Sequence, residues 1–474
     1  MRELLRKNSR FFLLLTPAAL LFRLYFALYI PCLSAGDTYT YANIARTLLN
    51  YHVYGMSGDN GSYYATLIRL PGYPYFLALM FRFFGQDNWR AVMILHAFID
   101  TATCFVIAAI ARRIINERAA KIAFVLAAFC PFTANYAGTV LTETLTIFCT
   151  SLAFLFAIIA FDEKRLGPMV GCGAALAYGI LLRPDTGWLL GSIGLFMLLR
   201  MWVIPGERKF LFRAGVVVLA VSLVPLVPWT IRNWRVFHVF QPLVNPAALD
   251  PGETEPAGLD RWMSTWIVDY SSLEDVAFHV TGEAIPFENI PERAFADAQE
   301  KAEVQQLIAR YNEHYEVPPD VDAAFGRIAD RHIREHPIQY HVIIPLLKVA
   351  DIWLRPRTEM LPIDTHWWRF SVDPHDSSWA VALMLLNFAF VAAAIMGMLR
   401  GPQMRYIGMF LMYMLVRTLL LGYMGEVEDR YTLECFPCLF ILGARYLAGW
   451  GQQSALSTEH SVDEETAKPL AIGN

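Results

Sequence analysis

A short polar stretch, residues 36–74, carries the side chains best suited to chemistry. Asp37 is the first carboxylate after an apolar run of 20 residues, 11–30, at the point where the chain should reach water. Arg69 stands two residues before the turn-forming sequence Pro-Gly-Tyr-Pro at 71–74. A carboxylate can accept the proton of a hydroxyl group, and an arginine can hold an anionic leaving group. An aspartate before an apolar-periodic run also fits a helix N-cap, so both interpretations of Asp37 stay open.

Two local patterns would position these side chains. Apolar and aromatic residues recur at helical spacing from residue 38 to residue 49, at Tyr41, Ile44, Ala45 and Leu48. This spacing predicts an amphipathic helix lying on a membrane surface. The Pro-Gly-Tyr-Pro turn would then end one element and direct the next helix.

The composition indicates a membrane protein. Of the 474 residues, 56% are hydrophobic and only 17% are charged, and the mean hydropathy is positive at +0.37. Apolar runs of about 20 residues recur along the chain, which is the length that a helix needs to cross a bilayer. We therefore predict an all-α polytopic membrane protein. The seven cysteines lie almost entirely within apolar runs, which argues against a disulfide framework.

The charge pattern gives the predicted orientation. Arg2, Arg6, Lys7 and Arg10 precede the first apolar run, so the N-terminus should be cytoplasmic. We predict about ten transmembrane helices, at residues 11–30, 89–111, 122–137, 140–161, 169–182, 187–202, 214–229, 379–398, 406–424 and 433–447. A shorter apolar segment, 73–84, should form a juxtamembrane or re-entrant helix, and another, 341–354, should lie at the membrane interface. Both termini then face the cytoplasm.

Four regions follow from this topology. Residues 1–235 form an N-terminal transmembrane region, whose first external loop, 32–75, contains the chemistry. Residues 236–340 form an extracytoplasmic, mainly helical domain, 341–450 a C-terminal transmembrane region, and 451–474 a disordered cytoplasmic tail. Between Asp250 and His336 there are 19 acidic residues against 7 basic ones, whereas the rest of the chain is basic. The sequence has no stripe of basic residues, so it gives no sign of a nucleic-acid partner.

Polar residues that interrupt the predicted spans converge on the external face. Charges at membrane depth are costly, so their concentration on one side indicates a polar cavity there. The candidates are Asp37, Tyr41, Arg69, Tyr73, Glu143, Arg183, Asp185, Arg232, Asn233, Lys348, Arg355, Glu426, Glu428, Asp429, Arg430 and Tyr431. Such a mixture suits sugar transfer from a lipid phosphate, because cations stabilise the leaving phosphate and a carboxylate takes the acceptor proton. Simpler interpretations are a solvated helix end for Glu143 and arginines that snorkel to headgroups.

The order of these motifs resembles the GT-C class of polytopic glycosyltransferases. The likeness is greatest to the branch of the protein mannosyltransferases and the lipid A aminoarabinose transferases. The matching elements are Gly36-Asp37, the helix bearing Tyr41, Arg69 with the 71–74 turn, LTETL around Glu143, Arg183-Pro184, Trp229 with Arg232-Asn233, and Arg430-Tyr431. The resemblance implies the GT-C fold and gives Asp37 the role of catalytic base. One departure is Thr38, where some branches carry a second acidic residue.

The sequence thus predicts a glycosyltransferase of a bacterial inner membrane with its active site facing the periplasm. It would move a sugar from a polyprenyl-phosphate donor to a hydroxyl of a glycan, lipid or protein acceptor, with inversion. Arg69, Arg183, Arg232 and Arg430 are the candidates to bind the donor phosphate. A divalent metal could sit among the external carboxylates, but nothing fixes its ligands, and no cofactor is otherwise indicated. The alternatives are a transporter or lipid flippase, and a polysaccharide polymerase or ligase that uses a lipid-linked oligosaccharide.

Two further patterns leave alternatives open. His96 and Asp100 share a helix face, where a buried pair would be either a proton relay or a structural contact between helices. Trp262 and Trp266 could form an aromatic platform for a sugar, or they could belong to a core.

Overall fold

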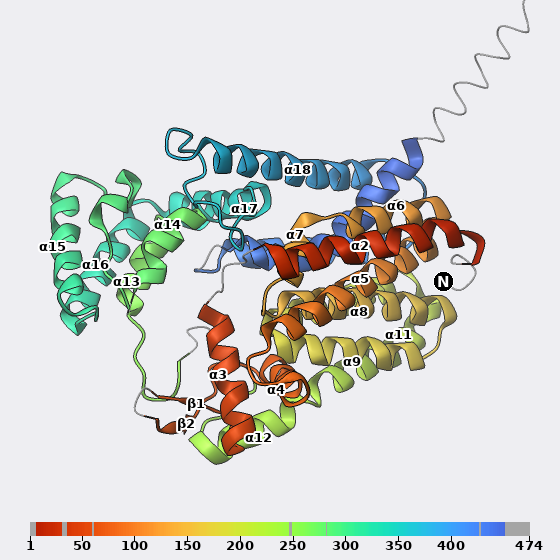
Figure 1. Ribbon diagram of the computed structural model, residues 1–474, viewed down its shortest axis with the longest axis horizontal. Helices are drawn as coiled ribbons and strands as arrows, with labels where there is room; N and C mark the ends of the chain where they lie inside the picture. Colours follow the sequence, from red (N-terminus) through yellow and green to blue (C-terminus); the bar gives the residue numbers. More distant parts are fainter. Residues whose placement is uncertain are drawn as a thin grey trace, which may run out of the picture.

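The structure, a computed structural model, describes residues 6–30, 36–58, 61–245, 249–280, 282–425 and 428–450 (Figure 1). Regular structure in these ranges is almost entirely helical. The exception is one antiparallel pair of short strands, β1 (Gly55–Ser57) and β2 (Tyr63–Ala65). The predicted all-α class is confirmed. Glu426 and the predicted disordered tail, 451–474, lie outside the described residues.

Six helical segments are long and apolar enough to cross a membrane. They are α2 (Ser9–Tyr29), α5 (Trp89–Ile114), α8 (Glu143–Glu163), α10 with its preceding turn (Pro184–Val203), the segment Pro205–Phe237, and α18 (Pro374–Leu399). A seventh would combine α6 (Glu117–Ala128) and α7 (Pro131–Ala137), which meet at a bend of 54°. Two apolar helices are shorter, namely α9 (Gly167–Leu182) and α19 (Ile407–Gly422), and a last helix occupies residues 436–450.

One predicted span is divided. Residues 214–229 were expected to form a single helix, but α11 (Arg208–Leu223) ends within them and α12 (Leu226–Phe237) begins after Pro225. Proline lacks the backbone N–H that would continue the helix, and its ring excludes the preceding turn from its usual position. The break lets α12 reach the segment that carries β1 and β2 (Figure 1).

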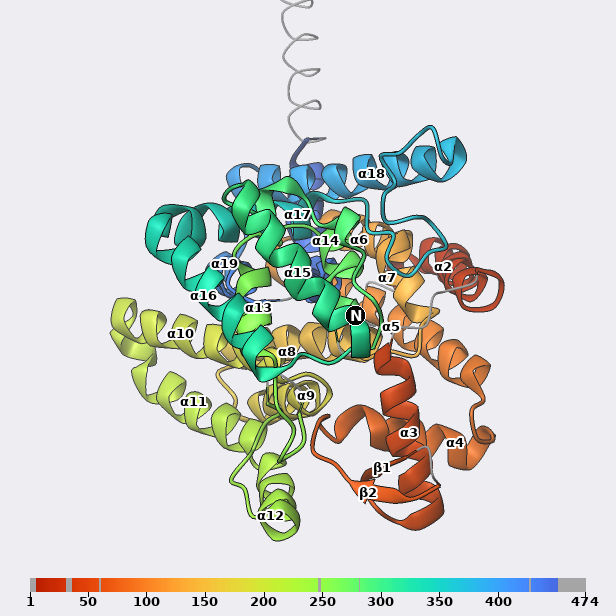
Figure 2. The same ribbon diagram turned by 90° about the vertical axis from the view of Figure 1, so that its left-hand side faces the viewer.

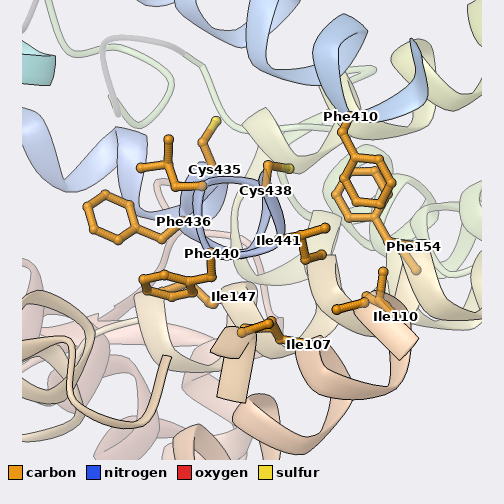
Figure 3. Packing of buried hydrophobic residues seen from close by; sticks show 14 of the residues in the cluster. Ile107, Ile110, Ile147, Phe154, Phe410, Cys435, Phe436, Cys438, Phe440 and Ile441 are labelled. Carbon is orange, nitrogen blue, oxygen red and sulfur yellow. The ribbon is translucent and has the colours of Figure 1, made fainter. Parts of the chain in front are cut away.

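The core of the helical bundle is apolar and aromatic. Figure 3 shows Ile107 of α5, Ile147 and Phe154 of α8, Phe410 of α19 and Phe436 packed together. The rings of Phe154 and Phe410 are stacked with their centroids 4.7 Å apart. Cys435 and Cys438 lie in this core as free, buried thiols.

The first extramembrane segment folds as predicted around its helix. α3 (Gly36–Tyr51) covers the expected amphipathic helix, and α4 (Gly72–Phe84) starts within the Pro-Gly-Tyr-Pro turn. A Cβ at Gly72 would come within 2.5 Å of the Leu181 carbonyl oxygen. Only glycine therefore allows the start of α4 to approach the end of α9 so closely.

A second, smaller core belongs to the helices α13 (Ala257–Ser264), α14 (Tyr270–Asp275), α15 (Ala298–His314) and α16 (Pro319–Glu335). These four helices gather at one end of the molecule (Figures 1 and 2). Trp262 and Trp266 are almost fully buried in this core, together with Phe325. They are therefore core residues rather than an open platform. A π-helical turn (Gln339–Ile343) then leads into α17 (Ile344–Leu354).

His96 and Asp100 do not pair with each other. Asp100 instead accepts a hydrogen bond from Arg23 Nε at 2.7 Å, and His96 Nδ1 lies 3.0 Å from the Thr139 carbonyl oxygen. The guanidinium of Arg23 also donates to the carbonyl oxygens of Ala127 and Ala128, at the bend between α6 and α7. Pro131 has no N–H to offer the Ala127 carbonyl, so Arg23 supplies the missing donor.

This buried pair generates a stability prediction. Asp100→Leu should destabilise the protein by about 3–5 kcal/mol, because it leaves the charge of Arg23 buried and unpaired. The double variant Arg23→Met/Asp100→Leu should recover a large part of this loss, since no lone charge remains.

Unfolding in detergent micelles would measure both variants. Lys7→Ala, which breaks the exposed contact between Lys7 and Glu117, is the matched control, with an expected loss below about 1 kcal/mol. If the single and the double variant lose the same free energy of unfolding, the unpaired charge of Arg23 is not the cause of the loss, and the prediction is wrong.

Candidate functional site

Asp37 lies in the first turn of α3, with each of its carboxylate oxygens held by a different arginine. Arg69 Nη2 donates to Oδ1 at 2.6 Å, and Arg430 Nη2 donates to Oδ2 at 3.0 Å. The Asp37 side chain keeps 21% of its surface exposed. Among the described contacts, these oxygens bind guanidinium groups rather than the N–H groups of the helix, so the cap interpretation is not supported.

The two arginines also set the ionisation of Asp37. Burial alone would raise the pKa of this carboxyl group, but the positive charges of Arg430 and Arg69 outweigh burial and lower the pKa to about 2. Asp37 is therefore ionised at neutral pH. The ring of Tyr41 completes its surroundings, with the guanidinium of Arg69 5.9 Å from the ring centroid.

Arg430 connects Asp37 to the C-terminal part of the chain. It lies in a 3₁₀ segment, η7 (Asp429–Cys435), directly before the helix of residues 436–450. Its Nε is 2.6 Å from Glu428 Oε2, and its Nη1 is 3.7 Å from Glu143 Oε1. Three carboxylates from distant parts of the sequence thus surround one guanidinium.

Arg183 extends this arrangement at the end of α9. It donates to Glu143 Oε1 at 2.7 Å and to Asp185 Oδ1 at 3.2 Å. Glu143, the first residue of α8, is therefore shared between Arg183 and Arg430. The ring of Tyr431 packs against both guanidinium groups, at 4.8 Å from Arg183 and 5.4 Å from Arg430. Eight predicted site residues thus form one network: Asp37, Arg69, Glu143, Arg183, Asp185, Glu428, Arg430 and Tyr431.

Part of the chain matches a known protein family. Residues 69–230 match the family model for dolichyl-phosphate-mannose-protein mannosyltransferase. The matched part contains Arg69, Glu143 and Arg183, whereas Asp37 and Arg430 lie outside it. A search of the curated proteins found no match to this sequence.

Solved structures share the architecture. The archaeal oligosaccharyltransferase AglB from Archaeoglobus fulgidus, in complex with an inhibitory peptide and a dolichol-phosphate, matches with a TM-score of 0.50 and 14% identity, over 99% of this chain and 53% of that chain. An oligosaccharyltransferase from the same organism, tethered to an acceptor peptide, matches with a TM-score of 0.51 and 13% identity, over 93% of this chain and 50% of that chain. ArnT from Cupriavidus metallidurans bound to undecaprenyl phosphate has a lower TM-score of 0.42 with 16% identity, over 92% of this chain and 78% of that chain.

The chain has the fold of the GT-C glycosyltransferases. The resemblance stated from the sequence is therefore confirmed. This chain spans about half the length of the two oligosaccharyltransferase structures.

Two charged residues of the network, Arg417 and Glu434, were missed in the sequence. Arg417 of α19 is fully buried, with Nη2 2.8 Å from Asp185 Oδ2 and Nη1 3.0 Å from Glu434 Oε2. Each lies within an otherwise apolar run, 407–422 and 433–447. A charge inside such a run was the available signal, because it needs a buried partner.

Six predicted residues make their contacts elsewhere, among them Asn233, which donates to the Gln241 carbonyl oxygen, and Arg355, which pairs with Glu359 at 3.0 Å. Arg232 donates to the carbonyl oxygens of Thr66 and Tyr54, both at 2.7 Å, so it holds the segment around β1 and β2. Lys348 donates to the carbonyl oxygens of Met424 and Gly425. Tyr73 is fully buried, with its ring centroid 5.0 Å from that of Tyr41. Asp429 faces Arg357, at 3.6 Å, rather than Asp37.

Arg357 is a further residue that the sequence did not reveal. Its guanidinium donates to the Asp429 carbonyl oxygen at 3.0 Å, to Thr432 Oγ1 at 2.5 Å and to Asn387 Oδ1 at 3.2 Å. These contacts join η7 to α18 and fix the backbone on either side of Arg430.

The suggestion of a metal gains no support at Asp37. Within the described residues, three metal-ligating side chains come within reach of one ion at Asp373, His375 and Asp376. These surround the start of α18, where Asp373 caps the helix by accepting from two backbone N–H groups. None of the three belongs to the network around Asp37.

The low pKa of Asp37 predicts how its contribution to stability depends on pH. The folded pKa of about 2 lies below the ordinary value of 3.8. The contribution is therefore complete above the ordinary value and is lost progressively as the pH falls from there through the folded pKa. The difference in melting temperature between wild type and Asp37→Asn should be constant from about pH 8 to about pH 5 and shrink below about pH 4. Thermal unfolding in detergent would measure it. A difference that already shrinks between neutral pH and pH 5 would contradict the assigned ion pairs.

Proposed function

We propose that this chain is a membrane glycosyltransferase that uses a polyprenyl-phosphate sugar, with Asp37 as its general base. The observation that carries the proposal is a partly exposed carboxylate held between two arginines, at the first turn of a surface helix. The GT-C fold supports it. So does the match to a family whose described donor is dolichyl-phosphate-mannose. AglB and ArnT were solved with dolichol-phosphate and undecaprenyl phosphate, respectively, which suits a lipid phosphate as the leaving group here.

The proposed reaction is a single displacement. The acceptor oxygen forms a bond to the anomeric carbon, while the bond from that carbon to the phosphate oxygen breaks. The acceptor proton moves to Asp37, and the bonding electron pair leaves with the lipid phosphate. Attack from the face opposite the leaving group inverts the configuration at the anomeric carbon.

A carboxylate with a pKa of about 2 is a weak base, so the arginines must change partner before proton transfer. The donor phosphate offers Arg69 and Arg430 another anion to bind. As these guanidinium groups turn from Asp37 to the phosphate, the pKa of Asp37 rises, because the charges that lowered it now stabilise another group. Donor binding thereby prepares the base.

The other network residues have supporting roles in this proposal. Glu143 and Asp185 hold Arg183, which is the third candidate for the donor phosphate, and Tyr431 spaces Arg183 from Arg430. Arg232 and Lys348 hold backbone rather than substrate, as their carbonyl contacts indicate. Tyr73 supports Tyr41 from within the apolar cluster beside α3.

We further propose that the site faces the periplasm of a bacterial inner membrane, with both termini in the cytoplasm. Glu143 and Asp162 lie near opposite ends of α8, a helix long enough to cross the bilayer. Basic residues gather at the Asp162 end, where Arg113 and Arg405 contact its carboxylate and Lys164 follows it. An excess of Lys and Arg marks the cytoplasmic side of membrane proteins. The α13–α16 helices, within residues 236–340, would then form an external domain.

The role of Asp37 is testable by transfer from radiolabelled polyprenyl-phosphate sugars in reconstituted vesicles, with membrane extract as acceptor. Asp37→Asn should lower kcat by about 10²–10⁴-fold, because the acceptor hydroxyl loses its base. Binding of the donor should be retained, since Arg69 and Arg430 remain and have lost a competing anion.

Asp87→Asn is the matched control for that variant. Asp87 also pairs with an arginine outside the membrane spans, Arg46 at 3.0 Å, but lies outside the network. The Asp87→Asn variant should transfer sugar at the wild-type rate. Full activity of Asp37→Asn would contradict its role as base, and a wild type inactive with every donor would contradict the proposed function.

A second prediction separates the phosphate-binding arginines from Arg232. Arg69→Gln and Arg430→Gln should each weaken undecaprenyl phosphate binding by about 10–100-fold, the loss expected for a charge-assisted hydrogen bond. Arg232→Gln should lower the melting temperature but leave the affinity of folded protein unchanged, since its partners are backbone carbonyls. Native mass spectrometry with added lipid measures the affinities. If Arg232→Gln weakens lipid binding while Arg69→Gln and Arg430→Gln do not, Arg232 belongs to the donor site and the prediction is wrong.

A further inference from the structure

A cavity of about 310 Å³ lies between the α13–α16 helices and the start of α17. It is found where the chain passes from α16 through the π-helical turn into α17. Side chains lining it come from three separate segments, among them Thr265, Arg293, Phe295, His332, His336 and Tyr340. This volume is at the lower end for small-molecule sites and suits a ligand the size of a monosaccharide.

The lining of the cavity contrasts with the charge of its surroundings. Between Asp250 and His336 the chain has 19 acidic residues and only 7 basic ones. None of the described side chains that line the cavity is a carboxylate, whereas one arginine and two histidines do line it. Asp269 and Glu300, which pair with Arg293 and His332, do not line the cavity, so the lining itself offers hydrogen-bond donors and no carboxylate, which suits an anion.

Two of the basic side chains, Arg293 and His332, are held in place by residues outside the lining. Arg293 is fixed by the Trp266 carbonyl oxygen, by Ser272 and by Asp269. Its Nη1 has no hydrogen-bond partner among the described residues. Its position is therefore set before a ligand arrives, and one edge of the guanidinium stays available.

His332 is held in a similar way. Its Nε2 lies 2.7 Å from the buried carboxylate of Glu300, and its Nδ1 lies 3.0 Å from Thr265 Oγ1. The Thr265 hydroxyl donates its only proton to the Trp262 carbonyl oxygen at 2.7 Å. The ring of His332 is therefore fixed from both sides before a ligand arrives.

Other donors at the cavity have no protein partner. The side chains of His336, Gln339 and Tyr340 make no hydrogen bond to a described residue, and His336 and Gln339 are exposed. Phe295 adds an aromatic face. Oriented donors beside an apolar ring are typical of a site that binds a substituted sugar.

We propose that this cavity binds an anionic group, a phosphate or a carboxylate, on the acceptor substrate. Ile344 lines the cavity, and Lys348, one turn further along α17, binds the backbone at Met424 and Gly425, just before Glu428 and Arg430. α17 thus runs from the cavity toward the segment that carries Arg430. An acceptor bound at the cavity would extend along this helix to Asp37. That the ligand is the acceptor rests on the proposed function, whereas the anion site itself does not.

Saturation-transfer NMR with galactose 6-phosphate and galactose, on protein in phosphatidylcholine nanodiscs without donor, tests the anion site. The phosphorylated sugar should bind at least about tenfold more tightly than galactose. His336→Gln should weaken its binding, and Gln339→Glu should abolish it by placing a carboxylate at the cavity. Both changed side chains are exposed, so the fold should be retained. His314→Gln, an exposed histidine at the end of α15, is the matched control and should bind as wild type does.

Arg430→Gln distinguishes this cavity from the Asp37 network. Loss of binding in Arg430→Gln with binding retained in Gln339→Glu would overturn the proposal, as would equal binding of the two sugars or no binding at all. Phosphatidylglycerol in the nanodisc separates two sources of the anion. Displacement of the sugar phosphate assigns the cavity to a lipid headgroup, and retention assigns it to a saccharide. Because donor and transfer are absent, failure of the proposed function would not affect this result.

Discussion

The ion pairs from Asp37 to Arg69 and Arg430 join parts of the chain that are far apart in sequence. Arg430 lies 393 residues from Asp37, so this contact ties the first extramembrane helix to the last helices of the bundle. Removing charges from water costs part of what their attraction returns, so only the remainder stabilises the fold. Their effect is to hold two guanidinium groups and one carboxylate at fixed positions before any substrate arrives. Fixed charges of this kind are what charge development in a transition state requires.

The balance of charge around Asp37 limits how an anion can bind. Within the described residues the network contains five carboxylates, Asp37, Glu143, Asp185, Glu428 and Glu434, and four arginines, Arg69, Arg183, Arg417 and Arg430. It therefore carries no excess of positive charge. A phosphate must displace one of the carboxylates from its arginines. Asp37 is the most exposed of the five, at 21% of its side chain against 12% for Asp185 and 2% for Glu143. The carboxylate most easily displaced is thus the one proposed to become the base.

Sequence reasoning reached the fold and most of the network because both leave local signals. Apolar runs reveal helices, and Asp37, Arg69 and Arg183 stand beside recognisable turns. Arg23 and Arg417 left only the signal of a charge inside an apolar run, which does not identify the partner, and Arg357 left none. Arg232 contacts backbone carbonyls apart from the Asp37 network, because its motif predicts a helix end near the site but not the direction of the side chain. The same limit applies to His96 and Asp100, where shared helix spacing suggested a pair and Arg23, 77 residues away, supplied the real partner.

The position of Arg430 depends on a residue that touches no part of the Asp37 network. Arg357 has a positive φ of 30°, which a residue with a Cβ adopts only at a cost of about 1–3 kcal/mol. Its buried guanidinium binds the backbone of Ile352 and Asp429 and the side chains of Thr432 and Asn387. Those bonds offset the strain and fix both Asp429 and Thr432, on either side of Arg430 and Tyr431. Because Arg430 must exchange one anion for another without moving its backbone, a rigid 3₁₀ segment suits it better than a mobile loop. The strained Arg357 supplies that rigidity from outside the network.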